Sequence, residues 1–123
     1  MKFNKNRQKI FDFIESHNEP INPQIVVEYF KNDMDQATVY RNLNYLEKNQ
    51  YIEGFIFSCI DSGTAKFYYP KNKHHHFLHC KVCHHFQKVE ECTKNRIEKL
   101  EEKNNIKIES HVMYYTGICN KCL

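Results

Sequence analysis

Two C-x-x-C pairs constrain the fold of this chain more than any other feature of its sequence. Cys80 and Cys83 form the first pair, and Cys119 and Cys122 form the second, near the end of the sequence. A two-residue gap lets one tight turn present two thiolates to the same metal ion, and two such pairs complete a tetrahedral zinc site. The spacing therefore predicts that zinc joins two distant segments of the chain.

The predicted role of this zinc is structural, because four sulfur ligands leave no open position for a substrate or a water molecule. A disulfide framework is one alternative, but it is typical of oxidising compartments, and we find no signal-peptide pattern. Cys59 and Cys92 also fit no obvious framework. Redox chemistry is a second alternative, but it normally uses a single C-x-x-C motif at the start of a helix.

Length and composition restrict the class of protein. The chain has 123 residues and a formal net charge of +3, which suits one domain or two small ones. No apolar run approaches membrane-spanning length, so we expect a soluble, cytoplasmic protein with no membrane partner. The charge is too small to indicate nucleic-acid binding by itself. No motif pairs a nucleophile with a base or two carboxylates with each other, so we expect no enzyme activity.

The first part of the sequence predicts three short helices. Apolar residues spaced by three and four predict a helix over residues 5–16. Asn22 followed by Pro23 is typical of the start of a second helix, because asparagine caps well and proline suits the first helical position. Asp35 can cap a third helix, which is expected to end near Asn49.

A β-hairpin is expected after the helices, with strands at residues 51–60 and 65–69 around a turn at 61–64. Three helices followed by a hairpin is the element order of a winged helix-turn-helix, in which the third helix enters the major groove of DNA. A small helical domain that binds no nucleic acid has the same element order and is the alternative, since fold does not by itself imply function.

The third predicted helix carries most of the candidate DNA contacts. Tyr40 and Arg41 are the first choices, for a base or thymine-methyl contact and for a guanine or phosphate contact. Tyr40 lies next to the apolar stripe of the helix, so a core position is equally compatible with the pattern. The complete set of candidate DNA-binding residues is Lys5, Gln36, Thr38, Tyr40, Arg41 and Asn42.

Residues 70–73 are polar, lack apolar periodicity, and are expected to link residues 1–70 to a second domain at 71–123. The expected elements of the second domain are strands at 77–80 and 85–89, a helix at 94–103 and a strand at 106–116. This order predicts a small α/β unit with a mostly antiparallel sheet. The long last strand is apolar on both faces, which so small a sheet cannot bury in one chain, so a homodimer is expected.

Several motifs together resemble the ferric uptake regulator (Fur) family of metal-dependent repressors. They are the A-T-V-Y-R-N-L stretch at 37–43, the histidine-rich run before Cys80, and the segment from His111 to Cys122. The resemblance implies an α+β protein: an N-terminal winged helix-turn-helix and a small C-terminal α/β dimerisation domain with a structural zinc site. It also implies a homodimer that represses transcription by binding a double-stranded DNA operator.

The same resemblance implies a second, regulatory metal site. Its histidines lie six and four residues before the first cysteine and eight before the third, and they correspond here to His74, His76 and His111. Strand periodicity independently places His74 and His76 on one face and His75 on the other. The family's better-known sensing site is not carried over, because His75 alone of its ligands is present. A surface histidine cluster without a fixed metal is the alternative.

A carboxylate normally completes this second site. Glu98 is the expected ligand, and Glu91 is the alternative if the helix is shifted. Three nitrogens and one oxygen would suit a divalent metal such as zinc, iron, manganese or nickel. A rival function is a histidine-rich metal-buffering or metal-chaperone protein built on the same scaffold. Sequence-specific DNA binding separates that function from a repressor.

Overall fold

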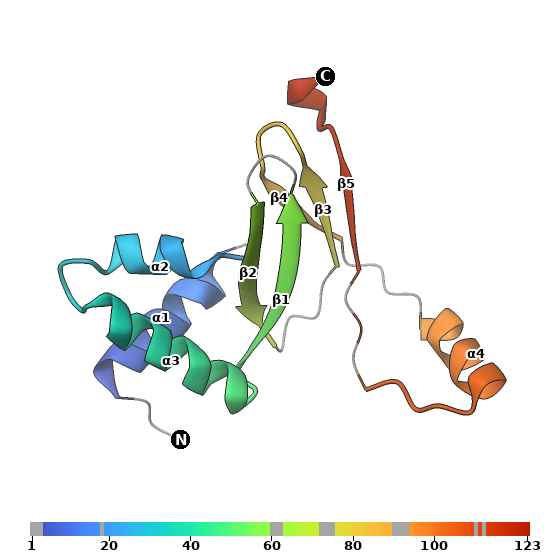
Figure 1. Cartoon of the computed structure of the whole chain (residues 1–123), viewed down its shortest axis with the longest axis horizontal. Coiled ribbons are helices and arrows are strands. Elements are labelled where there is room, and N and C mark those ends of the chain that lie inside the picture. The colour runs from blue at the N-terminus through green and yellow to red at the C-terminus, as the bar shows by residue number, and fades with distance from the viewer. Residues whose placement is uncertain are drawn as a thin grey trace. The chain divides into compact units, whose positions relative to one another are not determined.

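The computed structural model describes residues 4–17, 19–59, 63–71, 76–89, 94–109, 111 and 113–123. The chain divides into two compact units, residues 1–74 (unit 1) and 75–123 (unit 2). The described residues form four α-helices and two small sheets, an α+β fold as the sequence predicts (Figure 1). In the part of the chain that the structure describes, no helix is both long and apolar enough to cross a bilayer.

Unit 1 begins with three helices, α1 (Lys5–Ser16), α2 (Pro23–Tyr29) and α3 (Gln36–Lys48). Each helix starts at a side-chain cap that accepts a hydrogen bond from a backbone N–H in the first turn, which satisfies one of the donors left unpaired at a helix start. The capping residues are Asn4, Asn22 and Asp35, with bonds of 2.8, 3.0 and 2.8 Å. The predicted helices are confirmed, and α1 has the predicted bounds.

An apolar core holds these helices together. Its fully buried members are Ile10, Ile14, Val26, Val39, Leu43, Leu46 and Ile52. They recur at intervals of three and four along α1 and α3, which is the spacing that aligns side chains on one face of a helix. The packing buries one side of α3 and leaves its other side exposed.

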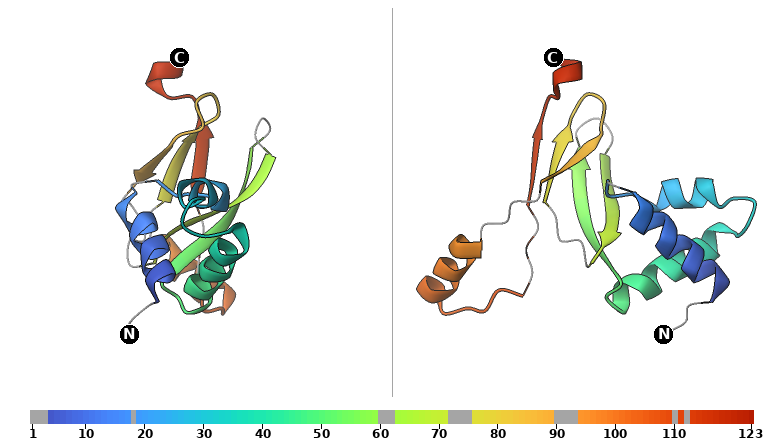
Figure 2. Two further views of the ribbon diagram at one scale, coloured as in Figure 1. Left: turned by 90° about the vertical axis from the view of Figure 1, so that its left-hand side faces the viewer. Right: turned by 180° about the vertical axis from the view of Figure 1, so that it is seen from behind.

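The hairpin of unit 1 consists of β1 (Ile52–Cys59) and β2 (Gly63–Pro70), paired antiparallel from Ile52↔Pro70 to Cys59↔Gly63. Tyr68 also pairs with Ile21, through backbone bonds of 3.0 and 2.8 Å, and this bridge ties the hairpin to the segment before α2. The helices lie on one side of the hairpin in the views of Figures 1 and 2. Unit 1 therefore has the predicted winged helix-turn-helix arrangement.

Unit 2 contains a three-stranded sheet in the order β4-β3-β5. Its elements are β3 (His76–Cys80), β4 (Phe86–Val89), α4 (Lys94–Asn104), β5 (Tyr114–Gly117) and the short 3-10 helix η1 (Asn120–Cys122). β3 pairs antiparallel with β4 but parallel with β5, so the prediction of a mostly antiparallel sheet is wrong. β4 returns the chain to the end at which β3 begins, and β5, reached through α4, then runs in the direction of β3.

The last strand is shorter than predicted, because residues 106–109 follow α4 as irregular chain. Asn105 has a φ of 53°, in the left-handed region, and ends the helix. The backbone N–H groups of Ile106 and Ile108 then donate to the carbonyl and the carboxylate of Glu101, at 3.3 and 2.8 Å. These donors are used to cap α4 and are unavailable for a strand ladder.

Candidate metal centres and nucleic-acid interface

The four cysteines of the two C-x-x-C pairs lie together at the end of the sheet of unit 2. Their Sγ atoms all lie within 4.8 Å of one another, and the Sγ atoms of Cys83 and Cys119 are 3.8 Å apart. A tetrahedron with metal–sulfur bonds of about 2.3 Å has sulfur–sulfur edges of about 3.8 Å. The cluster therefore fits a closed four-thiolate metal site, with Cys80, Cys83, Cys119 and Cys122 as its ligands.

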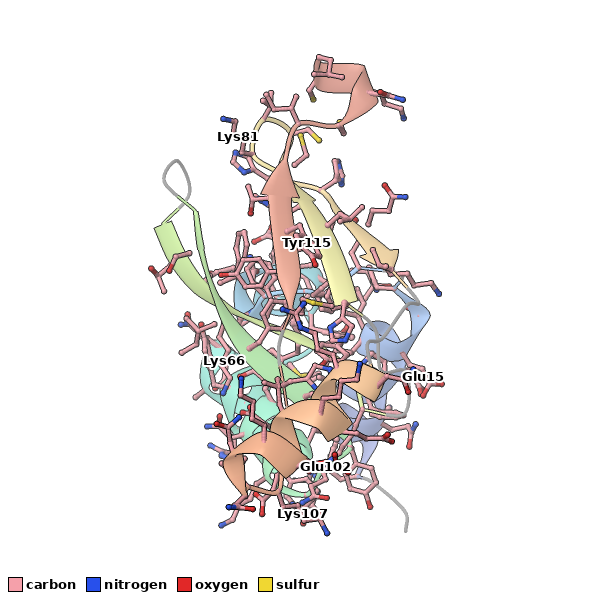
Figure 3. The ribbon with its side chains drawn as sticks, turned by 90° about the vertical axis from the view of Figure 1, so that its right-hand side faces the viewer. Glu15, Lys66, Lys81, Glu102, Lys107 and Tyr115 are labelled. Atoms are coloured by element: carbon pink, nitrogen blue, oxygen red, sulfur yellow. The ribbon has the colours of Figure 1, made fainter. Side chains whose placement is uncertain are left out.

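The strand register explains how two distant segments meet. β3 and β5 pair from Phe77↔Tyr114 to Cys80↔Gly117, so the end of β5 lies beside the first cysteine. The bond from the Lys81 N–H to the Gly117 carbonyl, 2.9 Å long, continues this pairing into the turn after β3. Figure 3 shows the strand that carries Tyr115 leading toward the turn that carries Lys81, with sulfur atoms drawn close to this end of the strand.

The backbone around Cys80 is arranged to stabilise a thiolate. Its Sγ accepts hydrogen bonds from the N–H groups of Val82, Cys83 and Cys119, at 3.4, 3.5 and 3.4 Å. The N–H groups of Cys119 and Cys83 outweigh burial and lower the pKa of Cys80 to about 5. By contrast, a hydrogen bond with Cys119, together with burial, raises the pKa of Cys122 to about 12. All four sulfur atoms can be ionised at such short distances only if a cation lies among them. Such a set of thiolate donors is typical of a structural metal site.

A second group of candidate ligands contains His76 and His111. His76 is the first residue of β3 and is 3% exposed. Its Nε2 lies 3.0 Å from the Nε2 of His111, which precedes β5, and the ring centroids are 4.8 Å apart. The fold thus brings together two of the three predicted histidines, with the same nitrogen of each ring facing the other. His74 lies outside the described residues.

The carboxylate ligand of this second site stays a prediction. Glu98 lies on α4 and is exposed. Among the described residues, only the cysteine cluster brings three or more potential metal ligands together. The carboxylate of Glu98 therefore does not lie beside the imidazoles of His76 and His111 in this structure. Glu91, the predicted alternative, lies outside the described residues.

Most of the predicted DNA-binding residues are accessible on unit 1. Lys5, Gln36 and Arg41 are exposed, and Thr38 and Tyr40 are partly buried. The hydroxyl of Tyr40 accepts a hydrogen bond of 3.4 Å from the Gln24 side chain on α2. Tyr40 is therefore not a core residue, and its hydroxyl is held at the junction of α2 and α3.

Asn42 differs from the sequence-based expectation that it lies on the surface of α3, because it is 4% exposed. Its amide donates to the Thr38 carbonyl at 2.9 Å and accepts from the Arg7 Nε at 3.1 Å. The Arg7 guanidinium carbon also lies 3.6 Å from the ring centroid of Tyr45. Asn42 and Arg7 thus fasten α1 to α3. Periodicity gave no signal for this role, because a buried asparagine is recognised only by its partners.

The sequence model of the ferric uptake regulator family matches residues 1–116. The chain belongs to the ferric uptake regulator family. Members of the Fur family are transcriptional regulators rather than enzymes, which confirms the prediction that the chain has no enzyme activity.

Two relatives illustrate how far the sequence similarity to Fur proteins extends. The ferric uptake regulation protein of Campylobacter upsaliensis is 27% identical over 99% of this chain and 80% of its own length. That of Neisseria meningitidis is 28% identical over 94% of this chain and 82% of its own length. The similarity therefore includes both units.

Solved structures of two bacterial regulators share the fold. The ferric uptake regulator of Helicobacter pylori, described as having three functional metal binding sites, matches with a TM-score of 0.76 and 24% identity, over 99% of this chain and 82% of that one. The Campylobacter jejuni peroxide stress regulator matches with a TM-score of 0.74 and 20% identity, over 94% of this chain and 87% of that one.

One further histidine of this Fur-family chain is a packing residue. His79 in β3 is 3% exposed, and its ring lies 4.9 Å from that of Phe86 and 5.7 Å from that of His84. Burial, and to a smaller degree His84, lower the pKa of His79. A neutral ring is thus favoured in the sheet beside the cysteine cluster. The sequence offered no sign of this, because His79 reads as one more member of a histidine-rich run.

Proposed function

We propose that the chain is a cytoplasmic, dimeric, metal-responsive repressor that binds double-stranded operator DNA and regulates genes of metal homeostasis or stress. Residues 1–70 bind DNA, and residues 71–123 bind metal and a second copy of the chain. The observation that carries the proposal is the exposed side of α3 in a winged-helix unit, where Gln36 and Arg41 project away from a buried core.

The side chains on and near α3 suit base and phosphate contacts. The Arg41 guanidinium can donate two hydrogen bonds to guanine or to a phosphate, and the Gln36 amide can pair with adenine. Tyr40 and Thr38 offer contacts to a thymine methyl group, and Lys5 offers a phosphate contact. Asn42 is not part of this set, because its amide is buried between α1 and α3.

We assign zinc to the four-cysteine cluster. Zinc is supported by the all-sulfur donor set and by a spacing that suits a tetrahedral ion. Its contribution would be folding free energy rather than reactivity, because a closed site has no position for a substrate. The residues that hold it join the turn after β3 to the segment after β5.

We assign a regulatory divalent metal to His76 and His111, together with His74 and a carboxylate from Glu98 or Glu91. Neutral imidazole nitrogens are ligands for zinc, iron, manganese and nickel. His76 lies where the chain enters β3, just after the segment that leaves unit 1. A fixed His76–His111 pair therefore restrains the start of unit 2, and the population of arrangements competent for DNA binding shifts accordingly.

Homodimerisation is supported by the large apolar side chains that unit 2 leaves exposed. They include Leu78, Leu100, Ile106, Tyr115 and Ile118, with exposed fractions from 40% to 61%. Tyr115 is labelled in Figure 3 on the face of β5. A concentration of this kind on so small a unit is typical of a surface that another chain covers.

A metal-titrated footprint on the DNA upstream of the protein's own gene tests the proposal. We expect protection of a short, nearly palindromic site that appears or disappears as the free divalent metal concentration rises. Metal binding without sequence-specific protection at any metal concentration contradicts a repressor and favours a metal-buffering protein. Size-exclusion chromatography with light scattering on the same samples measures the expected dimer.

A further inference from the structure

An ion pair connects the last turn of α3 to the hairpin. The Lys66 Nζ on β2 lies 2.6 Å from the Glu47 Oε1, and the two side chains are 39% and 29% exposed. Lys66 is labelled in Figure 3. Unit 1 has a second ion pair, between Lys31 and Glu28, but these residues are neighbours on one turn and are 60% and 73% exposed. The Glu47–Lys66 pair is the more sheltered, and it joins two different elements.

Gly54 provides the space through which this pair forms. It is the third residue of β1 and lies opposite Tyr68, and a Cβ atom there would meet the Lys66 Cε at 2.6 Å and the Glu47 Oε2 at 2.7 Å. Glycine is unfavourable inside a strand unless another group must approach closely. Gly54 thus lets Glu47 reach across β1 to Lys66 on the neighbouring strand.

The Lys66 side chain is held by contacts with Glu47 and Tyr68. Its Nζ lies 5.4 Å from the centroid of the Tyr68 ring. Burial acts to lower the pKa of Lys66, but the hydrogen bond that Lys66 donates to Glu47 and the attraction of Tyr68 and Glu47 raise it overall. Tyr68 is also the residue whose backbone ties β2 to Ile21. The ion pair therefore lies where the hairpin is anchored to the helices.

We propose that Glu47, Lys66 and Gly54 form a positioning latch that sets the placement of the hairpin relative to α3 when unit 1 binds its operator. This inference rests on the proposed DNA-binding function. In a winged helix, α3 and the hairpin contact the same duplex, so their relative placement decides whether both sets of contacts form together. Glu47 and Lys66 act through that placement and not by touching DNA.

Glu47→Gln gives the sharpest test, because simple electrostatics predicts a higher operator affinity whereas the latch predicts a lower one. Loss of an acid from a DNA-binding unit strengthens its attraction to phosphates. The latch instead predicts that operator affinity falls about fivefold. Lys66→Met should cause a similar loss, and the double variant should lose no more than either single variant, because the pair acts as a unit.

Gly54→Ala tests the same latch without changing a charge. The added methyl group would displace the flexible ends of Lys66 and Glu47, so the chain should fold while the pair is disrupted. Its operator affinity should fall by a similar factor. The reversed pair, Glu47→Lys with Lys66→Glu, should recover most of the affinity, because it restores the attraction with the charges exchanged.

The measurement is fluorescence anisotropy of the full-length, metal-loaded protein with an operator duplex and with a scrambled duplex of equal length, at several salt concentrations. Glu28→Gln and Lys31→Met are matched controls, because they make the same charge changes in a pair that joins no elements. Both should change operator affinity less than twofold. Thermal melting of each variant checks that it is folded.

Two results would overturn the latch. One is Glu47→Gln protein that binds the operator as tightly as wild type or more tightly. The other is a double variant whose loss of operator affinity equals the sum of the two single losses, combined with a weaker salt dependence in Lys66→Met. A slope of log affinity against log salt that is smaller by about one would identify Lys66 as a phosphate contact. If the wild-type protein does not discriminate between operator and scrambled duplex, the proposed function itself is wrong, and the latch with it.

Discussion

The two units of this chain bury different kinds of side chain. Unit 1 has a continuous apolar core, in which Ile10, Val26, Val39, Leu43 and Leu46 are all 0% exposed. In the described part of unit 2, the buried side chains are His76, Phe77, His79, Cys80 and Phe86. Three of these five carry a nitrogen or sulfur atom that can bind a metal.

This contrast predicts two different responses to metal. A fully buried aliphatic side chain contributes about 1.5–3 kcal/mol of stability, whatever the metal concentration. Thiols and imidazoles contribute comparably only when a metal holds them. Unit 1 should therefore fold without metal, whereas unit 2 should depend on it. Under the proposed function, this division keeps the DNA-binding surface of unit 1 constant while unit 2 responds to metal.

Loss of the cysteine cluster should give the largest effect. Cys122→Ser, or removal of zinc with a strong chelator, should unfold unit 2 and abolish dimers, since structural zinc contributes on the order of 10 kcal/mol to small domains. Hydrogen exchange should show lost protection in β3 and β5 and retained protection in α1 and α3. Cys59→Ser is the matched control, because Cys59 belongs to neither C-x-x-C pair of the sequence, and this variant should keep the zinc. A dimer that survives chelation would contradict the metal dependence of unit 2.

The reverse experiment removes part of the apolar core. Leu43 is 0% exposed in α3, so Leu43→Ala should destabilise unit 1 by about 2–5 kcal/mol through lost burial and a cavity. Thermal or urea unfolding, followed by hydrogen exchange of α3, measures the change. The zinc content of the purified protein should remain at the wild-type value. Zinc loss in this variant would show that the two units do not fold independently of each other.

Local signals in the sequence predicted most of the fold. The side-chain caps at Asn22 and Asp35 mark where the second and third helices begin, and the apolar period marks which side of a helix is buried. The two C-x-x-C pairs predicted the sulfur cluster, because a metal site imposes a spacing that survives in the linear sequence. Helix caps and apolar periodicity depend on residues at most a few positions apart, and each C-x-x-C pair has a spacing that metal binding itself requires.

Features that depend on distant partners were not predicted. The burial of Asn42 requires Arg7 to lie across α3, and the ion pair of Glu47 requires Lys66 from a strand and a gap at Gly54. The parallel pairing of β5 depends on the path of the chain through α4. No periodicity in the sequence reports such contacts, since each involves residues brought together only by the complete fold.

Arg41→Ala should weaken operator binding without altering either unit. Arg41 is exposed on α3, and loss of a guanine contact should cost about 1–3 kcal/mol of binding free energy. Anisotropy titration measures this loss, while zinc content and dimer mass should stay unchanged. Lys48→Ala, in the last turn of the same helix, is the control for a simple loss of positive charge. Equal losses in the two variants would mean that α3 contributes charge rather than specific contacts.

The smallest expected effect concerns His76 and His111, the pair through which we propose that metal binding to unit 2 changes DNA binding by unit 1. Coupling between two sites is typically about 1–3 kcal/mol. We expect His76→Ala or His111→Ala to remove the metal dependence of operator binding while the cysteine cluster keeps its zinc. The change in affinity should be about tenfold, toward the lower end of that range. The Nε2 atoms of the two rings lie 3.0 Å apart, so the two variants should behave alike.

His75→Ala provides the matched control for this last prediction, because strand periodicity in the sequence predicts that His75 lies on the face opposite His74 and His76. Its operator affinity should keep the wild-type dependence on free metal. Operator affinity measured against free metal for the three variants decides the assignment. Loss of the response in His75→Ala and its survival in His76→Ala would move the regulatory site to the other face of the strand, and the contact between His76 and His111 would then serve packing alone.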